Sequence, residues 1–409
     1  MKDDVRMRGF ARRHTVEAAL ELLDRHIQPL DAERLPLRSA SSRVLAADVE
    51  SDVDVPGFDR ATMDGYAVVA ASTEGAASYT PLPLVVIGDS LPARPFDGMV
   101  APGQAVRIMT GAPLPAGSDA VLPAEWIDGA SDSANVAALA AVSPGKNVGR
   151  RGEDIARGTT VLERGRTLRP QDLGVLSSIG AGDVCVVRRP RVRLVITGNE
   201  LLAAGSSPTG YSIADANGPM LKALAERDGA VVDDPWLVPD EPEAIVDALH
   251  CGSDVVIVSG GSSVGLEDLA PTSLAKHGEL WVHGIAMRPS SPTGFGKLGS
   301  SLVFLLPGNP VSCLCGYDFF AGRAVRTLAG RSKEWPYRPI VAALERKISS
   351  QIGRLDYARV RLVGGRVEPL AIGGASVLSS TTRADGFVIV PADSEGFAPG
   401  TDVTVWLYA

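Results

Sequence analysis

The hydrophobic pattern changes character several times along the chain. In residues 191–330, apolar runs of strand length alternate with segments whose apolar residues recur at helical spacing. This alternation predicts an α/β domain built on a doubly wound, mostly parallel sheet. The expected strands are 191–196, 230–237, 254–258, 279–285 and 301–306, and the expected helices are 217–227, 241–251, 271–277 and 310–329.

The flanking segments have other patterns. Residues 14–30 predict an amphipathic helix with Thr15 as its N-cap. Residues 50–140 carry short apolar runs among prolines and glycines, and residues 332–409 alternate with period two, so both predict β structure. We therefore expect a multidomain α/β plus β protein with four domains. These are an elongated linking domain (1–50 with 140–188), an inserted β domain (51–139), the α/β domain (189–331) and a small C-terminal β-barrel-like domain (332–409).

Composition narrows the class of protein. The 409 residues are 45% hydrophobic and 22% charged, which is typical of a globular protein too long for one core. A net charge of −8 argues against nucleic acid or an anionic membrane as partner. No apolar run approaches membrane-spanning length and the N-terminus carries acids, so we expect a cytoplasmic protein. The four cysteines form no C-x-x-C pair and the histidines show no zinc spacing, whereas a metal held by carboxylates stays open.

Two loops that follow predicted strands are candidates for binding an anion. The loop 259–265 holds three glycines and three serines directly after a buried strand, and Pro307-Gly308-Asn309-Pro310 follows a second strand and opens a helix. Glycines let backbone N–H groups approach an anion, and serine hydroxyls add donors. The carboxyl ends of parallel strands share one sheet edge, so both loops predict one anion site.

Three carboxylates are expected near these loops. Glu200, Asp240 and Asp268 follow three of the predicted strands. Three carboxylates beside a bound anion would repel it. Their presence is explained if a divalent cation lies between the carboxylates and the anion, or if they act as acid/base groups. Each residue taken alone is also explained as a helix N-cap, so both interpretations stay open.

The predicted inserted domain and its border hold further candidates. Asp64 and Thr110 lie in two dense stretches rich in proline, glycine and polar residues, which suit either a tight turn or a rigid ligand wall. Arg150 and Arg151 precede Asp154. They are either local cations for an anionic ligand or a solvated arginine pair.

Taken in order, these motifs resemble the molybdopterin molybdenumtransferase family, which includes the C-terminal region of gephyrin. The resemblance covers nearly the whole chain, through residues 56–68, 107–121, 147–155, 197–201, 215–217, 259–265, 307–310, 353–359 and 384–391. It implies an elongated four-domain homodimer that inserts molybdate into adenylylated molybdopterin and releases AMP with the help of Mg²⁺. The site would lie between the α/β domain of one subunit and the β domain of the other.

The resemblance also assigns residues. Those that match positions implicated in the family's site are Asp64, Thr110, Asp154, Glu200, Asp240 and Asp268, of which Glu200, Asp240 and Asp268 would hold Mg²⁺. Substrate-binding candidates are Ser259, Gly260, Gly261, Ser262, Ser263, Gly265, Arg288, Ser291, Pro307, Gly308, Asn309, Pro310, Arg150 and Arg151. Transient contact with the adenylylating enzyme and with apo-molybdoenzymes is compatible with this role.

One stretch departs from the family pattern. Where the family usually has Lys-Pro-Gly-Lys-Pro, this chain has Arg288-Pro289-Ser290-Ser291-Pro292. Arginine keeps the first charge, but Ser291 removes the second, which predicts weaker or altered oxyanion binding. An alternative hypothesis is a weakened paralogue that carries molybdopterin or its nucleotide, or serves as a scaffold, and a preference for tungstate is a third.

Overall fold

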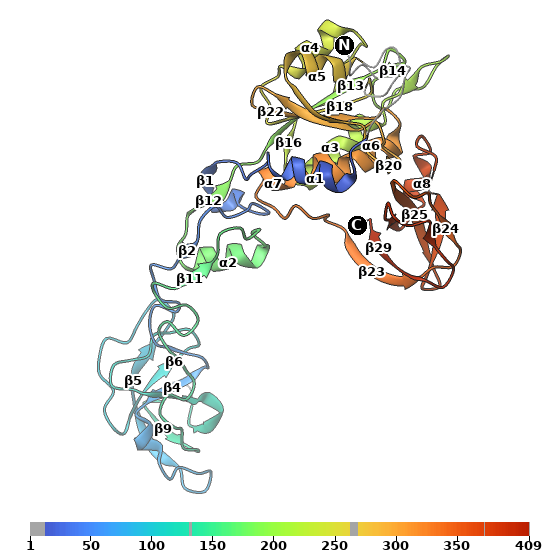
Figure 1. Cartoon of the computed structure of the whole chain (residues 1–409). Coiled ribbons are helices and arrows are strands. Elements are labelled where there is room, and N and C mark those ends of the chain that lie inside the picture. The colour runs from blue at the N-terminus through green and yellow to red at the C-terminus, as the bar shows by residue number, and fades with distance from the viewer. Residues whose placement is uncertain (1–12, 131–132, 262–268, 372, 409) are drawn as a thin grey trace. The chain divides into compact units, whose positions relative to one another are not determined.

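The structure is a computed structural model that describes residues 13–130, 133–261, 269–371 and 373–408 (Figure 1). The chain forms two compact units, one of Met1–Glu33 with Val186–Ala409 and one of Arg34–Cys185. The finer division into four domains stays a prediction. Within the described ranges, no helix combines the length and the apolar character needed to cross a membrane.

The first unit contains the α/β domain, whose sheet has the strand order β16-β13-β18-β22-β21-β19. The central strands β13 (Arg191–Thr197), β18 (Val255–Ser259) and β22 (Ser301–Leu306) are parallel. Two short strands, β16 (Val231–Val232) and β17 (Trp236–Val238), pair in parallel with β13. At the other edge, β21 (Gly294–Leu298) and β19 (Glu279–His283) run antiparallel. The predicted mostly parallel sheet is therefore confirmed.

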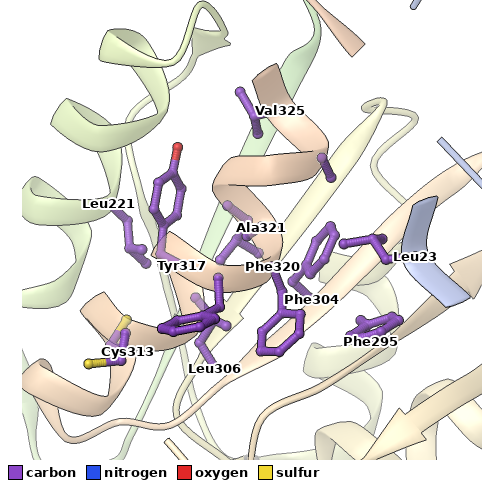
Figure 2. Close-up of a cluster of buried hydrophobic side chains, with 14 of the residues drawn as sticks. Leu23, Leu221, Phe295, Phe304, Leu306, Cys313, Tyr317, Phe320, Ala321 and Val325 are labelled. Atoms are coloured by element: carbon purple, nitrogen blue, oxygen red, sulfur yellow. The ribbon is translucent and has the colours of Figure 1, made fainter. Parts of the chain in front are cut away.

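Helices cover both faces of this sheet (Figure 1). Alternate residues of the buried strands face opposite sides: Ile257 packs into one core and Val256 and Val258 into another. The second core is closed by α4 (Pro242–Leu249) and α5 (Ala270–His277). The larger core is closed by α1 (Val16–Asp24), α3 (Asn217–Arg227), α6 (Pro310–Gly316) and α7 (Gly322–Leu328). Figure 2 shows this larger core, in which Phe295 and Phe304 of the sheet lie beside Phe320 and Leu23.

Several elements differ from the sequence prediction. The helix expected over 310–329 is interrupted by one π-helical turn, Tyr317–Ala321, and the helix expected over 14–30 ends at Asp24. The strand expected over 230–237 is split, because Asp233-Asp234-Pro235 separates its two short pieces. Strand β21 was not predicted, since its two glycines are more typical of a loop. A Cβ at Gly296 would lie 1.9 Å from the carbonyl oxygen of Glu279, so the close strand pairing requires glycine there.

The run Met287–Arg288 is also placed differently. No strand was expected here after the strand predicted over 279–285, but this segment, β20, pairs in parallel with β25 (Leu355–Val363) of the C-terminal sheet. That sheet has the order β20-β25-β27-β29-β23 with β26 beside β25. Its remaining strands are β23 (Arg338–Ala343), β26 (Arg366–Ala371), β27 (Gly386–Val390) and β29 (Asp402–Leu407). This region also contains helix α8 (Ser379–Thr382) and a two-stranded sheet of β24 (Ile348–Ser349) and β28 (Gly396–Phe397).

The second unit is built on a six-stranded sheet of order β7-β4-β6-β5-β9-β8. The β structure predicted for this region is therefore present. Its strands are β4 (Gly65–Val68), β5 (Leu82–Ser90), β6 (Gln104–Ile108), β7 (Ala120–Pro123), β8 (Ile127–Asp128) and β9 (Asn135–Ala138). Short ribbons are formed by β2 (Val49–Glu50) with β11 (Thr160–Leu162), by β3 (Arg60–Ala61) with β10 (Val148–Gly149), and by β1 (Ala32–Pro36) with β12 (Asp183–Val187). Helix α2 (Pro170–Ser178) begins after Arg169, where Asp172 accepts a hydrogen bond from the Arg169 backbone N–H.

Candidate functional site

A cavity of about 530 Å³, here called the sheet-edge cavity, lies where β13, β18 and β22 end. Parallel strands direct their carboxyl ends to one edge, which explains why loops distant in sequence meet there. The lining residues are Ile196, Thr197, Gly198, Glu200, Leu201, Ile213, Ala214, Asp215, Ala216, Asn217, Asp240, Ser259, Gly260, Gly261, Gly308, Asn309, Pro310 and Ser376.

Glycine is required where the loop after β18 turns. Gly260 has φ +102° and Gly261 has φ +54°, and a Cβ at Gly260 would lie 2.2 Å from the carbonyl oxygen of Thr197. The Gly260 N–H donates to the carbonyl of Leu306 at 3.1 Å, which ties the loop to the end of β22. The predicted loop residues Ser262, Ser263 and Gly265, together with Asp268, lie outside the described residues.

Asn217 lines the sheet-edge cavity, and no role could be assigned to it from the sequence. Its Nδ2 donates to Ser259 Oγ at 2.9 Å and to the Gly308 carbonyl at 2.7 Å, so one amide joins the two predicted anion loops. The carbonyl fixes the orientation of the amide, because it can only accept. Oδ1 is buried and has no hydrogen-bond partner among the described residues. The only sequence signal for Asn217 was its place in a family motif.

Two of the three predicted carboxylates line this cavity. Asp240 Oδ1 accepts a hydrogen bond from the Thr197 hydroxyl, and Oδ2 accepts one from the Asn199 N–H at 3.2 Å. Glu200 lies on the same cavity wall. In the described part of the chain, no group of three or more His, Cys, Asp or Glu residues is arranged to hold a metal. Two carboxylates suit Mg²⁺ when substrate phosphates and water supply the remaining oxygens.

The thiol nearest the cavity is unsuited to nucleophilic chemistry. Cys313 Sγ lies 3.5 Å from Ser259 Oγ and is fully buried. Burial raises the pKa of the Cys313 thiol to about 12. The thiol therefore stays protonated at neutral pH, and covalent catalysis by Cys313 is not expected.

A second cavity of about 860 Å³, here called the arginine cavity, adjoins the first and shares Gly308 and Asn309 with it. Besides Gly308 and Asn309, three of the predicted binding residues line this cavity: Arg288, Ser291 and Pro307. Pro310 lines the sheet-edge cavity instead. The full lining is Arg13, Thr15, Ala286, Met287, Arg288, Pro289, Ser290, Ser291, Pro292, Pro307, Gly308, Asn309, Ser312, Gln351, Ile352, Gly353, Arg354, Gly373, Gly374 and Ala375.

Three arginines line the arginine cavity. Arg13 and Arg354 join Arg288, although they come from the two ends of the chain, and no spacing rule would have grouped them. The side chains of Arg288 and Arg354 are 32% and 30% exposed. Ser291 Oγ is buried and lacks a hydrogen-bond partner within the described ranges. The cavity thus offers guanidinium donors to an oxyanion, and the Ser291 hydroxyl would become a further donor after a rotation of its side chain.

The remaining candidates belong to the other compact unit. Asp64 Oδ1 accepts from the Thr110 N–H at 2.7 Å and from its hydroxyl at 2.8 Å. Both hydrogen bonds lower the pKa of the Asp64 carboxyl below its ordinary value, and the bond from the Thr110 backbone N–H contributes more than the bond from its hydroxyl. Asp154 is exposed and follows Arg150 and Arg151 in the chain.

The two arginines of this unit are engaged with acids. Arg150 Nη1 lies 2.7 Å from Asp59 Oδ2, and Arg151 Nε lies 2.6 Å from Asp54 Oδ2. The Arg151 N–H also donates to Asp59 at 2.8 Å. Their charge is therefore partly neutralised, which weakens the expectation that they act as unpaired cations for a ligand.

These features define a class: a multidomain protein whose α/β domain holds an anion-type loop and carboxylates at the sheet edge, beside a cation-lined cavity. Three family models match in order along the chain. They are the MoeA N-terminal region (domains I and II) over residues 14–180, a probable molybdopterin-binding domain over 193–327, and the MoeA C-terminal region (domain IV) over 341–408.

Individual relatives match over almost the full length. Molybdopterin molybdenumtransferase 2 of Mycobacterium tuberculosis is 35% identical, with 91% of this chain and 94% of the relative covered. Molybdopterin molybdenumtransferase of Haemophilus influenzae is 33% identical over 95% and 97%. A crystal structure of the molybdopterin biosynthesis MoeA protein of Pyrococcus horikoshii matches with a TM-score of 0.84 and 32% identity, covering 97% of this chain and 99% of that one. The chain belongs to the MoeA family of molybdopterin molybdenumtransferases.

Proposed function

We propose that this protein inserts molybdate into adenylylated molybdopterin and releases AMP. The observation that carries the proposal is the pair of adjoining cavities that share Gly308 and Asn309. One has carboxylates and a glycine loop, and the other has arginines. A reaction between a pterin nucleotide and a tetrahedral oxyanion requires two such neighbouring environments.

The nucleotide part of the substrate is assigned to the sheet-edge cavity. Gly260 and Gly261, whose positive φ values favour glycine, line this cavity and bring the main chain to its wall, where phosphate oxygens would bind. The unpartnered carbonyl oxygen of Asn217 would accept a hydrogen bond from a substrate N–H or O–H group if the wall opens by a small rotation.

Mg²⁺ would be held by Asp240 and Glu200 together with phosphate oxygens, and Asp268 is a further proposed ligand. When bound, it would neutralise charge on the pyrophosphate and on the departing AMP. The role of Thr197 and Asn199 is to orient the Asp240 carboxylate through their hydrogen bonds to it. Such outer partners fix the direction in which a carboxylate presents its oxygens.

Molybdate is assigned to the arginine cavity. Arg288, Arg354 and Ser291 all line this cavity. The two arginines supply planar donor forks, and the buried Ser291 hydroxyl would donate after a rotation of its side chain. Arginines orient a tetrahedral oxyanion through several N–H bonds at once, which limits its freedom before reaction. The alternative, a carrier without turnover, is favoured only by the missing second lysine of the family stretch at Ser291.

We also infer a homodimer in which Asp64, Thr110 and Asp154 of one subunit complete the site of the other. The support is the family resemblance, together with the location of these residues in a compact unit separate from both cavities. Mixing inactive Asp64→Ala with inactive Asp240→Ala subunits tests this. Random exchange should restore about a quarter of wild-type activity if the site is shared between subunits, and none if it lies within one subunit.

The reaction itself is tested with purified protein, adenylylated molybdopterin, molybdate and Mg²⁺. We expect AMP release and activation of an apo-molybdoenzyme, and we expect EDTA to stop AMP release until Mg²⁺ is returned. Tight nucleotide binding with no AMP release at any molybdate concentration would instead support the carrier. Tungstate competition tests whether another oxyanion is preferred.

A further inference from the structure

A single buried carboxylate, that of Asp356, lies behind the wall of the arginine cavity. Asp356 is fully buried, with a side-chain exposure of 0%. It forms an ion pair with Arg288 Nη2 and lies 3.5 Å from Arg354 Nε. Its Oδ2 also accepts a hydrogen bond from Ser350 Oγ at 2.7 Å. Both Arg288 and Arg354 therefore contact the same buried acid.

The backbone fixes this arrangement. Arg288 and Asp356 are direct partners in the parallel pairing of β20 with β25, and the Leu355 N–H donates to the Ala286 carbonyl at 2.9 Å. The pairing joins a segment of the α/β domain to the C-terminal sheet at the cavity wall. A register set by main-chain bonds leaves the Asp356 side chain little freedom to turn away from Arg288.

The charges explain why a carboxylate is needed at this position. Two guanidinium groups drawn to one cavity wall repel each other, and the repulsion is stronger where burial lowers the effective dielectric constant. Asp356 compensates one of the two positive charges and leaves the cluster of three residues with a net charge of about +1. Since Arg288 and Arg354 are each about a third exposed, both retain N–H groups on the cavity side.

We infer that Asp356 is a positioning residue that holds Arg288 and Arg354 in the orientation that binds the tetrahedral oxyanion. This inference rests on the proposed function of the arginine cavity. Asp356 contacts no substrate itself. It acts through the two arginines.

The direction in which molybdate affinity changes distinguishes positioning by Asp356 from a purely electrostatic effect of its charge. Asp356→Asn removes a negative charge beside an anion site, so Coulomb attraction alone predicts tighter molybdate binding. Positioning predicts the opposite, because the two arginines lose the acid that aligns them. We expect molybdate binding to weaken about tenfold or more, the effect of losing a charge-assisted hydrogen bond.

The experiment measures binding of molybdate, and separately of AMP, to the full-length protein by isothermal titration calorimetry. For Asp356→Asn we expect weaker molybdate binding, a raised KM for molybdate with kcat changed less, and AMP binding within about twofold of wild type. Equal or tighter molybdate binding would overturn the inference. A wild-type protein that binds no molybdate would instead count against the proposed function.

Two further variants guard against a loss of folding. Asp356→Glu keeps the charge, so positioning predicts molybdate affinity closer to wild type than in Asp356→Asn. A purely structural role predicts that the larger glutamate is at least as damaging at this fully buried position. Ser350→Ala is the matched control, because it removes another partner of the same carboxylate and leaves both ion pairs in place. It should change molybdate affinity by less than about threefold.

Discussion

Gly260→Ala is expected to damage the sheet-edge cavity specifically. The added Cβ would lie 2.2 Å from the Thr197 carbonyl oxygen, and real Cβ atoms essentially never approach closer than 3.0 Å. The loop and the end of β13 must then separate by about 0.8 Å, the difference between these two distances. The backbone at φ +102° is also strained for alanine.

Two contributions determine how much stability the substitution removes. Strain at a positive φ costs about 1–2 kcal/mol, and weakening the Gly260–Leu306 hydrogen bond costs about 1 kcal/mol more. We expect the free energy of unfolding of this unit to fall by about 2–3 kcal/mol. AMP affinity should fall by about tenfold or more, because Thr197 also orients Asp240 and a shift near 1 Å misplaces both.

Gly252→Ala is the matched control. Gly252 precedes the same strand, has φ +65°, and has no atom within 4 Å of an added Cβ. It should lose about 1 kcal/mol of stability from strain alone and bind AMP normally. Urea unfolding followed by circular dichroism and AMP titration calorimetry give the two readouts. If Gly260→Ala binds AMP as tightly as Gly252→Ala does, the inferred role of the loop is wrong.

Three further predictions concern other parts of the chain. Arg323, assisted by Lys333, lowers the pKa of Asp24 to about 2, below its unfolded value near 3.8, so this stabilisation is present above about pH 4 and lost as pH falls through 2. Asp24→Asn should therefore cost about 2 kcal/mol at pH 7 and almost nothing near pH 2, as measured by urea unfolding at each pH. Thr110→Val should raise the pKa of Asp64 in an NMR titration and reduce AMP release, and Thr110→Ser should restore both, whereas an unchanged pKa would refute the hydroxyl's contribution. Ser291→Lys should tighten molybdate binding by about tenfold, since it adds a cation to the arginine cavity, and no change would show that the missing lysine is unimportant here.

Local patterns in the sequence were sufficient for most elements of the α/β domain. Strand and helix periodicities need only neighbouring residues, and helix 217–227 and strand 301–306 were placed without error. A turn that requires positive φ is also a local feature, so the glycine-rich sequence alone singled out the loop that contains Gly260. Prediction failed at β21, because the close pairing of this strand requires glycine, a residue that is usually disfavoured inside strands.

The order of most elements, the two anion-type loops and the family resemblance could be obtained without a structure, because each depends on motifs of neighbouring residues. The folded chain was needed to show that Met287–Arg288 pairs with β25, which brings Arg288, Arg354 and Asp356 together. It was also needed to show that Arg150 and Arg151 are paired with acids. Charged side chains that are tens of residues apart in the sequence come into contact only once strand register and burial are fixed. No local sequence pattern predicts such contacts.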